Sequence, residues 1–196
     1  MTADRTNQRK QRILQVLAKR QKDFCLVLNN IHDPHNVSAV LRSCDAFGVG
    51  EVHLLYTHTA FPVLGKKSSA SAKKWVDIKR HSSGAALVGE LRGLGRQVLA
   101  TGFGPAARSL SDWDLTKPTA VILGNEHSGV EDELSRLVPD QVYIPMLGMV
   151  QSLNVSVAAA VIVYEAYKQR QAKGLYDTPS LCPEEIEARY QAWLKK

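Results

Sequence analysis

The sequence has few cysteines, and they lie far apart. Cys25, Cys44 and Cys182 are the three cysteines among 196 residues. An odd number without paired or zinc-type spacing argues against a disulfide framework and predicts a reducing compartment. A long apolar run is also lacking at the N-terminus, which is charged from its start, so we expect no export signal and a cytoplasmic protein.

Glycines are absent from the place where a dinucleotide-binding protein needs them. The first predicted strand, residues 24–28, is followed by residues 29–36, NNIHDPHN. A dinucleotide cofactor requires glycines there so that its pyrophosphate can approach the backbone. Residues 124–129 begin like a phosphate loop, but Val130 and Glu131 stand where Lys and Ser or Thr are required. His32 and His35 lack two further ligands nearby, so we expect no bound metal.

Acidic residues are scarce in the first part of the chain. Residues 1–22 contain seven Lys or Arg against Asp4 alone, so the formal net charge of +6 belongs to this segment. A second basic cluster lies at residues 66–80. Two basic clusters on a neutral body favour a polyanionic partner such as nucleic acid, with solvated helix faces as the alternative. The candidate RNA-binding side chains are Arg9, Arg12, Arg20, Lys66, Lys67, Lys73 and Lys74.

Short apolar runs alternate with amphipathic segments through the middle of the chain. This alternation predicts an α/β fold, a largely parallel sheet with helices on both faces. Amphipathic helices are predicted at both ends, over residues 5–20 and 183–194, which divides the chain into a basic extension (1–22), a central domain (23–173) and a linker with a helix (174–196). Strands are predicted at 24–28, 51–56, 75–79, 97–101, 119–123 and 141–144, and helices at 37–47, 84–94 and 132–137.

Residues 143–165, YIPMLGMVQSLNVSVAAAVIVYE, form the segment around which the chain is organised. An uncharged, glycine-containing loop leads through polar residues 151–154 into a helix that is apolar on most of its circumference. Such a helix is predicted to be buried, and it is too short to span a bilayer, so we expect no membrane association. A polar loop that feeds a buried helix is where an α/β protein holds a ligand.

Polar side chains follow several predicted strands at the point where each strand ends. Taken singly, each suits a helix cap or the surface, but the carboxyl ends of parallel strands meet at one edge of a sheet. Together the residues therefore form a candidate site. They are Asn36, Arg42, Thr101, Asn125, Glu126, Ser152 and Asn154.

Three segments resemble the motifs of the SpoU branch of the SPOUT methyltransferases, which are RNA ribose 2′-O-methyltransferases. They are residues 36–42 (NVSAVLR), 122–130 (ILGNEHSGV) and 144–158 (IPMLGMVQSLNVSVA), intact and in the family's order. The similarity runs from about residue 5 to 177. The basic leading helix and the segment after Gly174 are most similar to members that methylate a guanosine of the tRNA D-loop, whereas residues 178–196 depart from the family.

The resemblance implies S-adenosylmethionine-dependent methylation of tRNA, a deep trefoil knot at about residues 120–170 and a homodimer across the knot helices. Ribosomal RNA or another tRNA position stays open as the substrate. A non-enzymatic RNA-binding module also stays open, but it leaves the intact polar set without a purpose. By motif, the cofactor contacts would be Thr101, Gly124, Ile144, Met146, Leu147, Gly148 and Leu153.

The resemblance also implies that Arg42 is the general base toward the ribose 2′-hydroxyl. A free guanidinium has a pKa above about 12, so its use near pH 8 costs on the order of 6 kcal/mol. Arg42 either passes its own proton to a substrate phosphate first, or stays charged and stabilises the developing alkoxide. The residues that would orient Arg42 and the ribose are Asn36, Glu126, Ser152 and Asn154.

Overall fold

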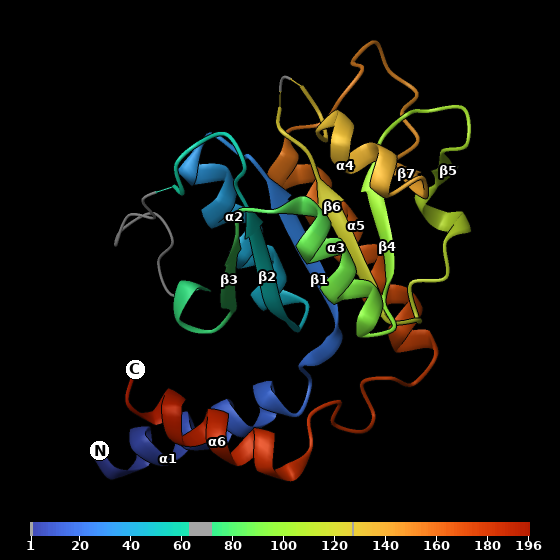
Figure 1. The fold of residues 1–196 in the computed structure, drawn as a ribbon. Coiled ribbons are helices and arrows are strands. Elements are labelled where there is room, and N and C mark those ends of the chain that lie inside the picture. Colours follow the sequence, from blue (N-terminus) through green and yellow to red (C-terminus); the bar gives the residue numbers. More distant parts are fainter. Residues whose placement is uncertain (1, 63–71, 127) are drawn as a thin grey trace.

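The computed structural model describes all residues except 1, 63–71 and 127 (Figure 1). Within them the strands form one seven-stranded sheet in the order β3-β2-β1-β6-β4-β7-β5, and every neighbouring pair is parallel. The predicted α/β fold with a parallel sheet is therefore confirmed. The strands are β1 (Gln21–Asn29), β2 (Val49–Leu55), β3 (Asp77–His81), β4 (Gln97–Thr101), β5 (Arg108–Ser109), β6 (Thr119–Leu123) and β7 (Gln141–Tyr143).

Helices cover both faces of the sheet (Figure 1). Because successive side chains of a strand point to opposite faces, Phe24, Leu26 and Leu28 of β1 pack with α2 (Pro34–Ala46) and α5 (Val155–Ala172). Cys25 and Val27 pack on the other face with α3 (Gly84–Gly93) and α4 (Asp132–Leu137). Two cores, one on each side of β1, thus hold the central strands in place.

The two terminal helices, α1 (Thr2–Leu17) and α6 (Pro183–Leu194), pack against each other beside the sheet (Figure 1). Ile13 and Leu17 of α1 meet Trp193 of α6 in a third, smaller core. An ion pair between Arg189 and Asp77 ties α6 to the start of β3. The amphipathic C-terminal helix therefore finds its apolar partner in the N-terminal extension.

Beyond differences at strand ends, one strand is displaced along the chain from its predicted range and one is missing from the prediction. The strand predicted at residues 75–79 lies at Asp77–His81, because a short 3-10 turn, η1 (Ala72–Lys74), directs the side chain of Val76 into the core before the strand begins. Strand β5 was not predicted, since its two residues are too few to show an alternating pattern. A second 3-10 turn, η2 (Leu110–Asp112), follows it directly.

The prediction that the helix after residue 154 is buried on all sides is wrong. Ala159, Ile162 and Val163 of α5 are buried against the sheet, but Val157 and Tyr164 are 48% and 52% exposed. A helix in an outer layer has the sheet on one side only, so its second apolar side lies on the surface of the single chain. Among the described residues, no helix combines the length and the apolar character needed to cross a membrane.

Candidate active site

A cavity of about 390 Å³ lies at the carboxyl ends of β4, β6 and β7. Three chain segments enclose it: the residues after Thr101, the turn that begins at Gly124, and the loop from Tyr143 to the start of α5. Ligands of open parallel sheets bind at this edge. The volume and the largely apolar wall suit a small organic cofactor.

Five of the seven predicted cofactor contacts line this cavity. Leu147 and Gly148 do not, and the side chain of Leu147 is fully exposed on the loop beyond the cavity. The fold therefore brings most of the predicted cofactor contacts around this cavity. The lining members are Thr101, Gly124, Ile144, Met146 and Leu153.

Gly124 occupies a position where only a glycine fits. A Cβ atom there would lie 2.1 Å from the carbonyl carbon of Gly129 and 2.1 Å from the nitrogen of Val130. Asn125 and Gly129 close the turn through two backbone hydrogen bonds of 2.9 Å. The hydroxyl of Thr101 accepts the Gly124 N–H at 3.4 Å. The turn is consequently held by close contact of backbone with backbone.

Three of the predicted polar residues form a hydrogen-bonded chain that joins three elements. Asn154 caps α5, where its Oδ1 accepts the N–H of Ser156 at 2.8 Å. The Asn154 amide donates to Oδ1 of Asn36 at 3.2 Å, and the Asn36 amide donates to Oε1 of Glu126 at 2.7 Å. Each donor helps to fix the orientation of the side chain that accepts its hydrogen bond. Ser152 and Glu126 both line the cavity.

Tyr56 fixes the β1–α2 loop, which leads to Asn36 in the first turn of α2. The phenol of Tyr56 donates a hydrogen bond of 2.6 Å to the carbonyl of Ile31. Burial raises the pKa of this phenol, and the carboxylate of Glu126 adds to the rise. Tyr56 is therefore a neutral donor at physiological pH, and the start of the β1–α2 loop keeps its place.

Arg42 does not line the cavity of its own chain. Its exposed side chain projects from α2 into a groove shared with the first two turns of α5. None of the described residues lines both this groove and the cavity. The groove is formed by His35, Ser38, Ala39, Arg42, Ser43, Ser156, Val157 and Ala160.

Sequence reasoning missed a buried polar network beside the cavity. Asn30 has a left-handed backbone (φ 50°), and its side chain bonds the N–H of Thr57 at 3.1 Å and the carboxylate of Glu131. The carbonyl of Asn30 accepts the amide of Asn125 at 2.8 Å. These bonds tie the turn after Gly124 to the ends of β1 and β2. The one available signal was the Asn29-Asn30 doublet directly after an apolar strand.

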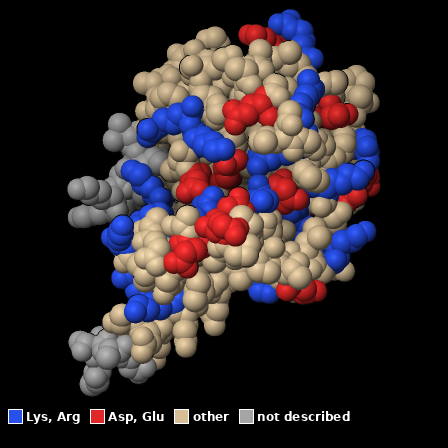
Figure 2. Space-filling view, turned by 60° about the horizontal axis from the view of Figure 1, so that its bottom comes forward, with Lys and Arg blue, Asp and Glu red and all other residues tan. Residues whose placement is uncertain are grey.

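The predicted RNA-binding residues have different environments. Arg9 and Arg12 are exposed on α1, as are Lys73 and Lys74 in η1, and basic side chains lie interspersed with acidic ones over the face that includes the α1 and α6 end (Figure 2). Lys66 and Lys67 lie outside the described residues.

The assignment of Arg20 to RNA binding is wrong, because this side chain is buried. Its guanidinium forms an ion pair with Asp45 and donates to the carbonyl of Val49 at 3.1 Å. It also lies over the ring of Trp193, 5.5 Å from the centroid. Arg20 therefore joins the first strand to α2 and α6 instead of facing solvent.

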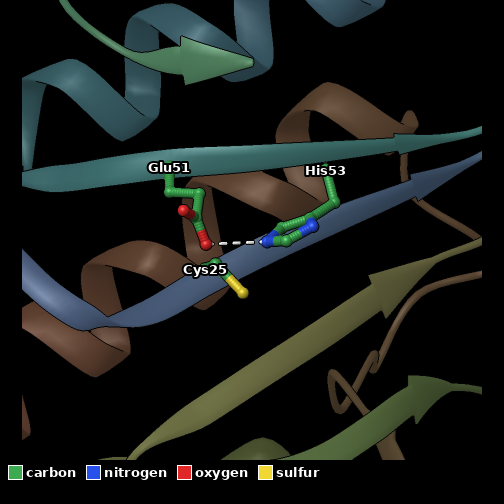
Figure 3. Close-up of side chains that lie close together, drawn as sticks. All are labelled: Cys25, Glu51 and His53. Carbon is green, nitrogen blue, oxygen red and sulfur yellow. Dashed lines mark hydrogen bonds and ion pairs between the residues drawn. The ribbon is translucent and has the colours of Figure 1, made fainter. Parts of the chain in front are cut away.

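Cys25, Glu51 and His53 come together on β1 and β2, with possible ligand atoms within 4.8 Å of one another (Figure 3). Two cations share the group: Lys79 pairs with Glu51 at 2.7 Å, and Arg96 donates to the Cys25 sulfur at 2.7 Å. Burial raises the pKa of Glu51, but hydrogen bonds from His53 and Lys79 outweigh it and hold that pKa well below its usual range. Burial raises the pKa of Cys25 to about 12, so the sulfur stays a thiol. These contacts describe a buried ion-pair network.

The fold and the cavity define an α/β protein that binds a small cofactor at the carboxyl edge of a parallel sheet, next to an ordered chain of polar side chains. The chain belongs to the SpoU rRNA Methylase family, whose model matches residues 23–164. This match confirms the resemblance of the three motifs, all of which lie inside the matched range.

Individual relatives agree with the family match. A tRNA (guanosine(18)-2′-O)-methyltransferase from Thermus thermophilus is 46% identical over 193 residues, which cover 98% of this chain and 99% of that protein. The crystal structure of the A. aeolicus TrmH/SpoU tRNA modifying enzyme superposes with a TM-score of 0.90 at 36% identity and covers 97% of this chain and 96% of that one. The SpoU methyltransferase AviRb from Streptomyces viridochromogenes, solved in complex with AdoMet, has a TM-score of 0.69 at 27% identity, covering 80% and 61%.

Proposed function

We propose that the protein transfers the methyl group of S-adenosylmethionine to the ribose 2′-oxygen of guanosine 18 in the D-loop of tRNA. The observation that carries this proposal is the cavity: segments of two family motifs enclose it, and the polar chain links the remaining motif to its edge. The full-length similarity to a tRNA (guanosine(18)-2′-O)-methyltransferase supports the choice of substrate. Because tRNA is the proposed substrate, we infer that the protein is cytoplasmic.

The cavity residues fit S-adenosylmethionine. The wall is largely apolar, and the residues around it offer backbone N–H and C=O groups that can pair with an adenine edge. Thr101, Gly124, Ile144, Met146 and Leu153 would hold the cofactor, with Leu147 and Gly148 on the flanking loop. When bound, the cofactor supplies an electrophilic methyl group on a sulfonium.

The polar chain would place the ribose. Asn36 is held by Asn154 on one side and by Glu126 on the other, so its orientation is set before the substrate arrives. Ser152 contributes a hydroxyl at the cavity wall. Arg42 acts on the 2′-oxygen, either as a base that has passed its proton to a substrate phosphate or as a cation that stabilises the alkoxide.

A homodimer and a knot are parts of this proposal. The exposed apolar side of α5, with Val157, Val161 and Tyr164, adjoins the groove of Arg42 and suits a second copy of the chain. A partner on this side would cover Arg42, whose side chain does not line the cavity of its own chain. Two features support the knot. Strand β7 lies between β4 and β5 in the sheet although both come before it in the sequence, and the turn at Gly124 is tight.

If Arg42 serves the cavity of the partner, two inactive variants should complement each other. Arg42→Ala lacks the acting side chain, and Gly124→Ala lacks a working cavity. After co-refolding, a mixed dimer holds one intact site, so a 1:1 mixture should regain about a quarter of the wild-type rate, by the symmetry of a two-fold dimer. The measurement is methyl transfer to tRNA by each variant alone and by the mixture.

Sedimentation of the mixture controls for dimer formation. Dimers without recovered activity would place Arg42 in its own chain's site, and a monomeric wild-type protein would remove the dimer from the proposal. Arg42→Ala alone, taken through the same refolding, gives the background rate.

The exposed cations of α1 are expected to bind the phosphates of tRNA. Changing Arg9 and Arg12 together to alanine should weaken tRNA binding and reduce the slope of log K against log salt by about 1–2, because each phosphate contact releases a counterion. Point changes are preferable to deleting α1, since deletion would also remove Ile13 and Leu17 from the core with Trp193. Arg136→Ala, an exposed arginine on α4, is the control. An unchanged slope would exclude these two residues from the interface.

The substrate class is tested by methyl transfer from labelled S-adenosylmethionine to unmodified transcripts. We expect label on tRNA and none on ribosomal RNA. Label on ribosomal RNA alone would keep the chemistry and replace the substrate. Binding of both cofactor and RNA with no transfer at all would favour a non-enzymatic RNA-binding module.

A further inference from the structure

An exposed aromatic ring stands at the mouth of the cavity. Phe103 follows β4, lines the cavity and is 67% exposed to solvent. Its ring lies 6.0 Å from the ring of Tyr143, which lines the same cavity, with 39° between their planes. Ligand pockets are commonly lined by aromatic side chains, and a ring exposed at the entrance of a pocket is available to a ligand that binds there.

The turn that carries Phe103 is supported from β7. Gln141 accepts the N–H of Gly104 at 2.8 Å through its Oε1. A Cβ atom on Gly102 would lie 2.8 Å from this oxygen, and one on Gly104 would lie 2.6 Å from it. The two glycines thus allow Gln141 to pack directly against the backbone on both sides of Phe103. Gly102 also donates to the carbonyl of Val142 at 3.1 Å.

This arrangement presents the ring and leaves it uncovered. The backbone on either side of Phe103 is fixed by β7, whereas most of the side chain faces solvent, and Tyr143 is its one aromatic neighbour among the described residues. The deeper wall already has apolar residues for a cofactor, among them Leu123, Ile144 and Leu153. A ligand that contacts Phe103 would therefore rest at the outside of the cavity, beyond the space for the cofactor.

We propose that Phe103 stacks on the base of the nucleotide whose ribose is methylated. This inference rests on the proposed function and adds a positioning residue to it. A nucleotide in an RNA loop can leave the stack of its neighbours, and aromatic side chains then hold its base by stacking. Stacking on the base would carry the attached ribose toward the polar chain of Asn36 and Glu126, and the base itself needs no charged contact.

The test is steady-state kinetics with tRNA, combined with the dissociation constant for S-adenosylmethionine. Phe103→Ala should lower kcat/KM for tRNA about tenfold or more, the usual effect of losing one stacked base. Cofactor affinity should change less than about twofold, since the base and not the cofactor loses its contact. Phe103→Leu, which keeps the apolar surface without an aromatic face, should resemble Phe103→Ala.

Phe103→Trp should keep the activity of the wild type, and the fluorescence that it adds to that of the three native tryptophans should be quenched when tRNA is added. Leu94→Ala, a 57% exposed apolar residue at the end of α3, is the control and should leave kcat/KM unchanged. Weaker cofactor binding at unchanged KM for tRNA would assign the ring to adenine and overturn the inference, as would full activity of Phe103→Leu. If the wild-type protein transfers no methyl group to tRNA, the proposed function is wrong instead. The quenching experiment distinguishes this failure from a failure of the stacking inference, because it measures contact with tRNA and not transfer.

Discussion

Replacing Arg42 by alanine is expected to reduce methyl transfer to tRNA by about 10²–10⁴-fold, the range for removing a general base or an oxyanion-stabilising donor. The dissociation constant for S-adenosylmethionine should stay within about twofold, because Arg42 lies in the α2–α5 groove and not in the cavity wall. Within its own chain the exposed side chain has little packing to lose, so the melting temperature should hardly change. Single-turnover transfer and equilibrium dialysis measure the two quantities separately.

The two possible roles of Arg42 differ in their response to lysine. An amine loses its proton more readily than a guanidinium, so a base at this position predicts that Arg42→Lys keeps some activity with an altered pH profile. A purely electrostatic role predicts reduced activity with the pH profile of the wild type. Parallel losses of transfer and of cofactor binding in Arg42→Ala would show that the residue is structural and would contradict both roles.

Replacing Gly124 by alanine is expected to weaken cofactor binding strongly, and to destabilise the fold if the distortion spreads. The added Cβ would lie 2.1 Å from backbone atoms of Gly129 and Val130, and backbone cannot yield as the end of a flexible side chain can. Overpacking of this kind costs on the order of 3 kcal/mol. If the distortion stays local, cofactor affinity falls about 100-fold; if it spreads, the melting temperature falls as well. Calorimetric titration and thermal unfolding measure the two effects.

Gly89→Ala supplies the matched control for Gly124→Ala. Gly89 lies inside α3, and a Cβ atom there has no neighbour within 4 Å. The change should leave cofactor binding intact and raise stability by roughly 0.5–1 kcal/mol, since alanine favours a helix over glycine. Wild-type affinity in Gly124→Ala would contradict the account of the turn after β6.

Much of the fold could be predicted because its signals are local. The apolar runs of β1, β4 and β6 are continuous, as buried parallel strands require, and Asn154 has the residue type of a helix cap. Parallel strands bring their carboxyl ends to one edge, so the candidate polar residues could be grouped before any contact was known. The bonds from Asn154 to Asn36 and on to Glu126 are consistent with that grouping.

What could not be predicted depends on contacts between distant residues. Arg20 is buried because Asp45, on another element, neutralises it, and an isolated basic segment gives no sign of that partner. The periodicity of α5 shows which of its sides are apolar but not which side the sheet covers. The bond between Asn30 and Glu131 spans 101 positions along the chain. A two-residue strand such as β5 leaves no pattern at all.

The central claim concerns one oxygen atom, and a matched pair of tRNA substrates tests it most directly. One tRNA carries guanosine at position 18, and the other carries 2′-deoxyguanosine there and is otherwise identical. With labelled S-adenosylmethionine we predict incorporation into the first, mapped to the 2′-oxygen of that nucleotide, and none into the second. Equal incorporation into both would contradict the account, because the methyl group would then be going to a base or to another ribose.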